Sequence, residues 1–159
     1  MKVPITLAAM VGAGFLSTAI PGAPAGASSP PPSCGLPGAV IVGTSGNNIL
    51  IGTPGDDVIR GLGGDDVIRG LGGNDKIYGG AGDDELYGGA CGDKVNGDDG
   101  ADKVHGGGGN DRLKGGLDRD LFWGDAGDDR IRGDQGLDRA RGGAGSNFCD
   151  ATVETPVNC

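Results

Sequence analysis

The chain repeats a nine-residue unit. From Gly43 to Asp150 the sequence divides into consecutive nonapeptides without one insertion or deletion. Chains of low complexity keep their composition but not their phase, so this array predicts a repeat fold in which each unit stacks on its neighbours. The twelve units read GTSGNNILI, GTPGDDVIR, GLGGDDVIR, GLGGNDKIY, GGAGDDELY, GGACGDKVN, GDDGADKVH, GGGGNDRLK, GGLDRDLFW, GDAGDDRIR, GDQGLDRAR and GGAGSNFCD.

Four positions of the unit are nearly constant. Position one is always glycine, and position four is glycine except at Cys91 and Asp118. Position six is aspartate in ten units and asparagine in the first and last, at Asn48 and Asn147. Position eight is Leu, Ile, Val or Phe in all but the last two units. The unit therefore alternates turn residues, one acidic group and one apolar group.

These positions predict a turn followed by a strand. The first six residues hold glycines where a tight turn needs positive φ, and they end in a carboxylate. The last three place one apolar side chain between two outward ones, which is a short strand with one inward residue. A strand of three residues buries too little to stand alone, so the units must stack.

Stacking creates a charge problem that a cation solves. Parallel strands lie about 4.8 Å apart, which brings position-six carboxylates of stacked units within a few ångströms of one another. Without a cation these like charges force the turns apart. Calcium prefers six to eight oxygen ligands, which paired carboxylates and turn carbonyls supply. We therefore expect metal binding and folding to be coupled.

The units resemble the hemolysin-type, or RTX, calcium-binding nonapeptide G-G-x-G-x-D-x-U-x, which GGAGDDELY and GGGGNDRLK match in full. The resemblance implies an all-β fold, a right-handed parallel β-roll (β-solenoid) in which each unit makes half a coil and calcium binds in the turns. Position-six aspartates then bridge turns two units apart, with backbone carbonyls completing each site. The implied ligands are Asp57, Asp75, Asp93, Asp111 and Asp129 along one edge and Asp66, Asp84, Asp102, Asp120 and Asp138 along the other.

The array departs from the family pattern in two turns. Cys91 replaces a glycine, and Asp118 with Arg119 changes the ninth unit, so weaker or empty sites are expected beside them. The tail NFCDATVETPVNC resembles the cysteine-bracketed ends of small secreted calcium-binding proteins with such repeats. Its physical role is to cap an open end of the roll, where backbone groups lack partners.

The N-terminus predicts export. Lys2 precedes an uncharged apolar run from Val3 to Ile20, and small residues follow with Ala-x-Ala cleavage after Ala25 or Ala27. We interpret residues 1–27 as a signal peptide, 28–42 as a proline-rich linker and N-terminal cap, 43–150 as the roll and 151–159 as a C-terminal cap. An uncleaved anchor fits less well because Gly12, Gly14 and Pro21 interrupt the run. The protein is predicted to be secreted and extracellular.

Four cysteines fit two disulfides in an exported chain, for which three connectivities exist. Cys149 and Cys159 close a short C-terminal loop and are the preferred pair, and Cys34 with Cys91 follows by elimination. A zinc site is disfavoured because the chain has no Cys-x-x-Cys and only one histidine, His105.

Charge and composition limit the function classes. The 37 glycines among 159 residues argue against a conventional core and leave disorder as the competing interpretation, which the phase of the repeat opposes. The formal charge of −9 disfavours nucleic acid or an anionic membrane as a general partner. Loss of Lys2 with the signal leaves 12 basic and 22 acidic residues, a charge of −10. Ten inter-turn sites are the maximum for twelve units, and five calcium ions would neutralise the chain.

The outward residues suggest partners. If units alternate between two sheets, even units place Lys76, Lys94, Arg112 and Arg130 in one file, flanked by Arg60, Lys114 and Arg132. This file is either a strip for an anionic polysaccharide or cell-wall polymer, or a solvated face that offsets the acidic edges. Odd units expose the apolar residues Ile49, Ile51, Val67, Tyr87, Leu121 and Trp123, which form either a partner surface or a cover for neighbouring coils. His105 also points outward from an odd unit and is expected to be solvated.

The preferred function is that of a secreted, non-enzymatic calcium-ion-binding protein whose ions build its fold. The alternative is a calcium-dependent adhesive module that binds a cell surface or polysaccharide. An enzyme is disfavoured because the chain has neither His-Glu-x-x-His nor Gly-x-Ser-x-Gly.

Overall fold

The computed structural model describes residues 34–150 and 152–159, and these form two parallel β-sheets without a helix. The predicted signal peptide and residues 28–33 of the predicted linker segment lie outside the described residues. No helix in the described part of the chain is long and apolar enough to cross a membrane.

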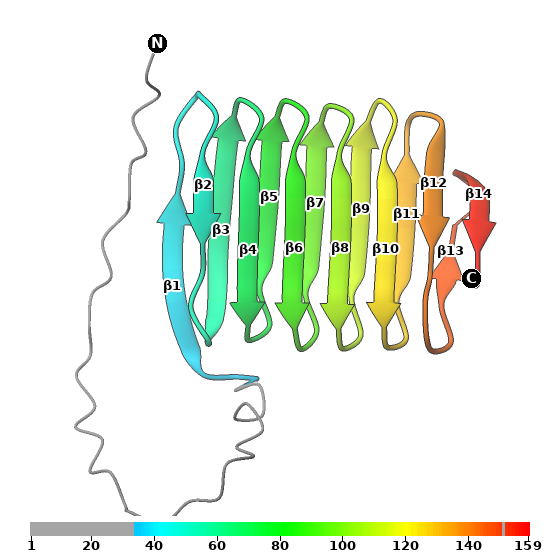
Figure 1. Ribbon diagram of the computed structural model, residues 1–159, viewed down its shortest axis with the longest axis horizontal. Helices are drawn as coiled ribbons and strands as arrows, with labels where there is room; N and C mark the ends of the chain where they lie inside the picture. Colours follow the sequence, from blue (N-terminus) through cyan, green and yellow to red (C-terminus); the bar gives the residue numbers. More distant parts are fainter. Residues whose placement is uncertain (1–33, 151) are drawn as a thin grey trace, which may run out of the picture. The chain divides into compact units, whose positions relative to one another are not determined.

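Consecutive strands alternate between the two sheets (Figure 1). One sheet has the order β1-β3-β5-β7-β9-β11-β13 and the other β14-β12-β10-β8-β6-β4-β2. The first, sheet A, consists of β1 (Pro37–Val42), β3 (Asp56–Gly63), β5 (Lys76–Ala81), β7 (Lys94–Asp99), β9 (Arg112–Leu117), β11 (Arg130–Asp134) and β13 (Phe148–Cys149). The second, sheet B, consists of β2 (Ile49–Ile51), β4 (Val67–Gly72), β6 (Glu85–Ala90), β8 (Lys103–Gly108), β10 (Leu121–Ala126), β12 (Asp138–Arg141) and β14 (Val153–Val157).

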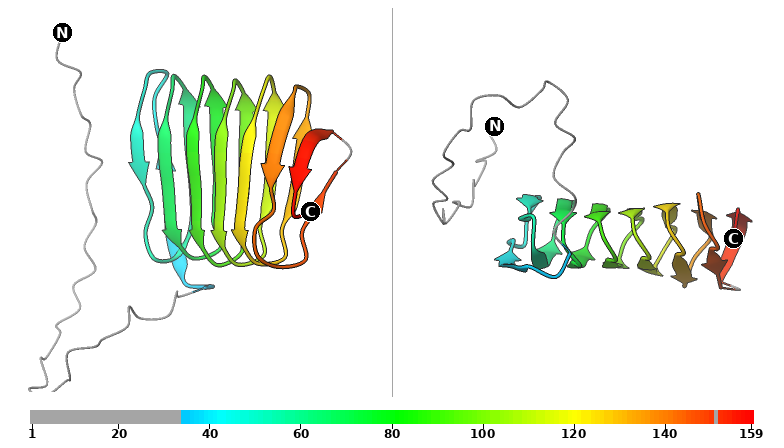
Figure 2. Two further views of the ribbon diagram at one scale, coloured as in Figure 1. Left: turned by 45° about the vertical axis from the view of Figure 1, so that its right-hand side comes forward. Right: turned by 90° about the horizontal axis from the view of Figure 1, so that it is seen from below.

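The register equals two repeat units. Lys76 pairs with Lys94 and Lys94 with Arg112 in sheet A, while Ile68 pairs with Leu86 in sheet B. Partners in space are thus eighteen residues apart in sequence, and each coil gives one strand to each sheet. Figure 2 shows the two sheets as facing layers joined by turns at both edges. This is the predicted parallel β-roll.

The strands are longer than the predicted three residues. Most strands have six, running from position seven of one unit to position three of the next, so that only positions four to six remain as a turn. The reason is the burial pattern: in β5 both Ile77 and Gly79 face inward. Position one therefore continues the strand beyond the apolar residue instead of opening the turn.

The core is a single file of position-eight side chains between the sheets. Ile59, Ile68, Ile77 and Leu86 are completely buried, and the file runs from Leu50 to Ala140 and ends beside Val153. Inward aspartates lie beyond it at both edges, so the apolar interior is only one side chain wide along each strand. Such a core buries little surface per residue and leaves the turns to supply much of the stability.

Added strands and disulfides hold both ends. At the N-terminal end β1 pairs with β3, and at the C-terminal end β14 pairs with β12. Disulfides join Cys34 to Cys91 and Cys149 to Cys159, which confirms both predicted pairs. The predicted domain boundaries themselves stay a prediction.

The outward face of sheet B agrees best with the second of the two predicted roles, that of covering neighbouring coils. Ile49 and Ile51 are exposed, but Val67, Tyr87, Leu121 and Trp123 are half-buried because stacked neighbours cover them. His105 is not simply solvated: its ring lies between Tyr87 and Trp123, with centroid distances of 4.9 and 4.3 Å. The eighteen-residue register places these position-nine rings on top of one another.

Candidate metal sites in the turns

The ten predicted aspartates lie at the two edges of the roll, in the turns that join the sheets. Asp75, Asp93, Asp111 and Asp129 precede strands of sheet A and Asp57 is the second residue of β3, while Asp66, Asp84, Asp102, Asp120 and Asp138 precede or begin strands of sheet B. All ten are at most 2 % exposed. The structure therefore gathers them into two buried files.

One oxygen of each carboxylate bonds to the preceding turn. The Asp75 Oδ1 accepts the backbone N–H of Asp57 at 2.7 Å, and the Asp102 Oδ1 accepts that of Asp84 at 2.9 Å. The same bond recurs along both edges, always across eighteen residues, and it ends at Asn147, whose Oδ1 accepts from Asp129. An asparagine can make this bond as well as an aspartate, so the bond alone does not require a charge.

The second oxygen lacks a partner. Within the described residues no hydrogen bond reaches the buried Oδ2 atom of nine carboxylates. A buried acceptor without a donor is costly, and a buried charge without a partner more so. These nine atoms belong to Asp66, Asp75, Asp84, Asp93, Asp102, Asp111, Asp120, Asp129 and Asp138.

Asp57 is the exception among the ten. Its Oδ2 accepts the backbone N–H of Thr53 at 2.6 Å, and its Oδ1 accepts from the Thr53 hydroxyl and the backbone N–H of Ala39. Position two of this unit is a threonine, and the N-terminal strand β1 supplies the other donor. The first carboxylate of its edge is thus satisfied by the protein itself.

The metal-free electrostatics oppose ionisation in the files. Burial, with a further contribution from the stacked aspartates, raises the pKa of Asp93 and Asp102 to about 8 and that of Asp111 and Asp120 to about 7. Burial also raises the pKa of the remaining carboxyls whose Oδ2 is unpartnered: to about 6 for Asp75 and Asp84, and in the same direction for Asp66, Asp129 and Asp138. A proton or a cation must therefore accompany each of these nine buried carboxyl groups.

Position-one glycines shape the space around the free oxygen. A Cβ on Gly97 would lie 2.0 Å from Asp102 Oδ2 and 2.9 Å from the Gly115 carbonyl oxygen. The same holds at Gly61, where the distances to Asp66 Oδ2 and the Gly79 carbonyl oxygen are 2.2 and 2.4 Å. These glycines do not have positive φ. The prediction that turn conformation demands glycine is wrong for position one, where lack of space demands it.

Positive φ occurs instead at positions two and four. From Leu62 onward every position-two residue has positive φ, and from Gly64 onward so does every position four. Cys91 and Asp118 keep this conformation in place of glycine, with φ of 84° and 68°. The left-handed position two was missed because leucine and aspartate occupy it in five units, and neither signals positive φ.

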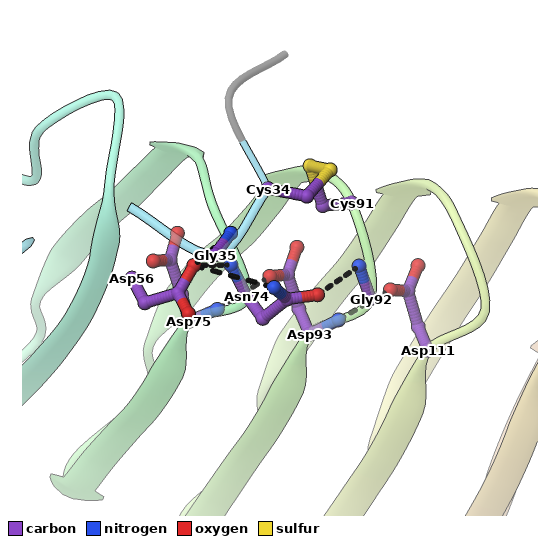
Figure 3. Close-up of a disulfide and its surroundings, with 9 residues drawn as sticks. All are labelled: Cys34, Gly35, Asp56, Asn74, Asp75, Cys91, Gly92, Asp93 and Asp111. Atoms are coloured by element: carbon purple, nitrogen blue, oxygen red, sulfur yellow. Dashed lines mark hydrogen bonds between the residues drawn. A yellow bond between two sulfur atoms is a disulfide. The ribbon is translucent and has the colours of Figure 1, made fainter. Parts of the chain in front are cut away.

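A second ladder at position five was also missed. The Asp56 Oδ1 accepts the backbone N–H of Asn74, and the Asn74 Oδ1 accepts that of Gly92 (Figure 3). These bonds run to the following turn, opposite in direction to those of position six. Position five is Asp or Asn in seven units, and this frequency is the signal that could have revealed the ladder.

The disulfide from Cys34 ties the N-terminal segment to the outside of this edge. Figure 3 shows it reaching the turn of the sixth unit at Cys91, and the Gly35 backbone N–H donates to Asp56 Oδ1 at 3.0 Å. The bridge therefore spans the turns of the second and fourth units, which contain Asp57 and Asp75.

The donor set fits a hard cation. It consists of buried carboxylate oxygens and nearby backbone carbonyls, the ligand type that calcium prefers. Among the described residues, no three or more His, Cys, Asp or Glu side chains converge on one point. A cation held here would therefore have to be shared between turns and completed by backbone oxygens. Ligation by the ten aspartates stays a prediction.

Comparison with known proteins agrees with this chemistry. The family model for the RTX calcium-binding nonapeptide repeat matches residues 42–77, 60–90, 69–104, 92–122 and 123–152. No curated protein matches the chain.

Proposed function

Because the chain belongs to the family of RTX calcium-binding nonapeptide repeat proteins, we propose that it is a secreted calcium-binding protein in which the ions complete the fold. The observation that carries this proposal is the set of nine buried carboxylate oxygens without a hydrogen-bond donor, aligned along both edges of one roll. Calcium between stacked turns supplies the missing partner.

The ligands under this proposal are the nine aspartates with an unpartnered Oδ2, with Asp57 closing the file at the N-terminal end. Stacked carboxylates at each edge are shared by successive ions, and glycine carbonyls such as those of Gly79 and Gly115 contribute backbone oxygens. Bound calcium supplies positive charge that offsets the desolvated carboxylates.

Folding and binding are then one equilibrium. At neutral pH the metal-free roll must either protonate its buried carboxyls or leave the charges unpaired, and both raise its free energy. The unfolded chain avoids this cost because its carboxylates are hydrated. Sites of the extracellular class bind calcium at about 10⁻⁴ to 10⁻³ M, so the exported chain folds where calcium is abundant.

The predicted signal peptide and two disulfides support an extracellular location. Disulfides persist in oxidising compartments, and both pairs form in the described part of the chain. The roll acts as a structural binding module in this proposal, with no catalytic role assigned to any side chain.

Far-UV circular dichroism on residues 28–159 tests the proposal. With chelator the chain should give a disordered spectrum, and with calcium a sheet spectrum, while isothermal titration and metal analysis count the ions. Replacing Asp102 with asparagine should reduce the ion count. The matched control is D83N in the adjacent turn. Asp83 is exposed, and its Oδ1 accepts the Ala101 N–H, as an asparagine Oδ1 can also do. A sheet spectrum that is the same with chelator and with calcium would overturn the proposal.

A further inference from the structure

Four cations form an uninterrupted file on the outward face of sheet A. Lys76, Lys94, Arg112 and Arg130 are exposed and occupy position seven of successive strands from β5 to β11. The strand register pairs each directly with the next. Neighbouring residues of the file are therefore one strand spacing apart, about 4.8 Å, along the axis of the roll.

Folding alone does not explain this file. Like charges placed directly opposite one another destabilise a sheet. Nor are these charges neutralised locally: in the described part of the chain none of the four has a carboxylate oxygen within 4.0 Å. On the same face Lys114 and Arg132 do have such partners, at Asp134 and Asp150. The file thus differs from the ordinary cations beside it.

Sheet B shows that the file is not a general property of the roll. The equivalent outward position there holds Val67, Glu85, Lys103, Leu121 and Arg139 in register, so no two cations are neighbours. Of the two sheets in the described part of the chain, only sheet A carries a continuous row of positive charge.

The file ends in a hollow with an aromatic wall. A depression of about 290 Å³ lies between β9, β11 and β13, and its lining includes Arg112, Arg130 and Phe148. The Phe148 side chain is 62 % exposed. The exposed Phe148 ring offers an apolar surface at the end of the file, and Arg112 and Arg130 line the same hollow together with Asp150. An apolar surface in a hollow that cations line is suited to a charged sugar ring.

We propose that this face binds an acidic polysaccharide with one carboxylate on each sugar, a polyuronate, lying across the strands from Lys76 toward Phe148. Such a polymer carries one negative charge per sugar along its length, and this face offers one cation per strand along the axis of the roll. A polymer with several charges per sugar would leave charges unmatched. Single-stranded nucleic acid requires stacking platforms, and between Lys76 and the hollow the described part of this face offers one exposed aromatic ring, Tyr78, with the Arg60 guanidinium 5.5 Å from its centroid.

This inference rests on the proposed function, because calcium makes the face available. The chain without calcium carries a formal charge of −10 after loss of Lys2 and repels a polyanion. Calcium orders the sheet and cancels the acidic edges, so that the cations of the face dominate the local field. Binding of the polysaccharide should therefore require calcium.

The test uses fluorescently labelled oligogalacturonates of two to eight sugars, which are too short to gel with calcium. Anisotropy titrations with calcium-loaded protein should show affinity rising with length until four or five sugars occupy the file and the hollow, and then levelling off. The variant K94E/R112E should bind the tetramer about tenfold more weakly or worse. The control K103E/R139E makes the same charge change on sheet B and should bind within about twofold of the parent.

Circular dichroism separates the two ways of failing. If calcium does not fold the parent chain, the proposed function is wrong. If both variants and the parent fold with calcium but no oligomer binds, or both variants weaken equally, the polyuronate inference is wrong. The polyuronate inference is also wrong if heparin, single-stranded DNA or anionic vesicles bind more tightly than the oligogalacturonates and this binding is lost in K94E/R112E. The face would then belong to another polyanion.

Discussion

The substitution D102N separates a calcium ligand from a structural hydrogen bond. The Asp102 Oδ1 accepts the Asp84 N–H, and an asparagine Oδ1 can accept it equally well. The second oxygen, which lacks a partner within the described residues, becomes an amide beside the Gly115 carbonyl oxygen, to which it can donate. The change therefore removes a buried charge while preserving the ladder.

The expected effect has opposite signs with and without calcium. In chelator, burial raises the pKa of Asp102 from 3.8 to about 8, which at pH 7 costs the folded chain about 2 to 4 kcal/mol. D102N removes this cost, so the metal-free variant should be more stable than the parent. In saturating calcium it should be less stable by about 3 to 5 kcal/mol, because the ion loses a buried charged partner.

Urea unfolding followed by circular dichroism measures both effects, with an osmolyte added where the chelated chain is unfolded. D83N serves as the control and should change stability by less than about 0.5 kcal/mol in either condition. Equal destabilisation of D102N in chelator and in calcium would refute the reasoning, because Asp102 would then act only through its hydrogen bond.

Three further predictions concern pH, glycine and the disulfide. In chelator, the free energy of unfolding measured in urea should fall as pH rises from about 4 to about 8, because carboxyls with raised pKa values favour the folded state only while they are protonated. With calcium the free energy of unfolding should rise over this range. The same trend in both conditions would contradict the assignment of these carboxyls as ligands. G97A should abolish calcium-induced folding in circular dichroism, because its Cβ would lie 2.0 Å from Asp102 Oδ2. G108A should fold normally, because its Cβ would have no heavy atom within 4 Å. Normal folding of both variants would refute the steric role of glycine at position one. C34S/C91G removes a cross-link across 57 residues and restores the turn glycine, so in calcium its free energy of unfolding should fall by about 4 kcal/mol. Titration should give the same number of bound ions as in the parent. A lower number would mean that the disulfide shapes the calcium sites.

The sequence predicted the parts of the fold that recur with the nine-residue period. The alternation at positions six to nine requires Ile77 to point inward and Lys76 to point outward, and the eighteen-residue register follows once units alternate between two sheets. The strand length was underestimated because glycine at position one gives no sign of facing inward. Gly97 is buried, and the Asp102 carboxylate occupies the space that a Cβ atom on it would need. This contact exists only in the folded chain, so the sequence alone does not reveal it.

Other features arise only from stacking. The sequence places Tyr87, His105 and Trp123 at the same position of alternate units, but it does not show that their rings would cover one another. Likewise, nothing in GTPGDDVIR reveals that Thr53 satisfies Asp57, since the other units with an aspartate at position six lack threonine at position two. A repeat pattern predicts what its members share, whereas the end of the array is set by the residues that break the pattern.

The two side-chain ladders explain why both ends of the roll need special residues. Position-six oxygens accept from the preceding turn and position-five oxygens accept from the following one, so an interior turn is bonded on both sides. The first turn of this edge has no predecessor, and the N-terminal segment supplies donors instead, through the N–H groups of Ala39 in β1 and of Gly35 just before it. At the other end the Thr152 hydroxyl accepts the N–H groups of Gly133 and Asp134. Under the proposed function, ions between turns add to a lattice in which the first carboxylate oxygen already accepts a backbone N–H, so calcium serves the second oxygen and not the first.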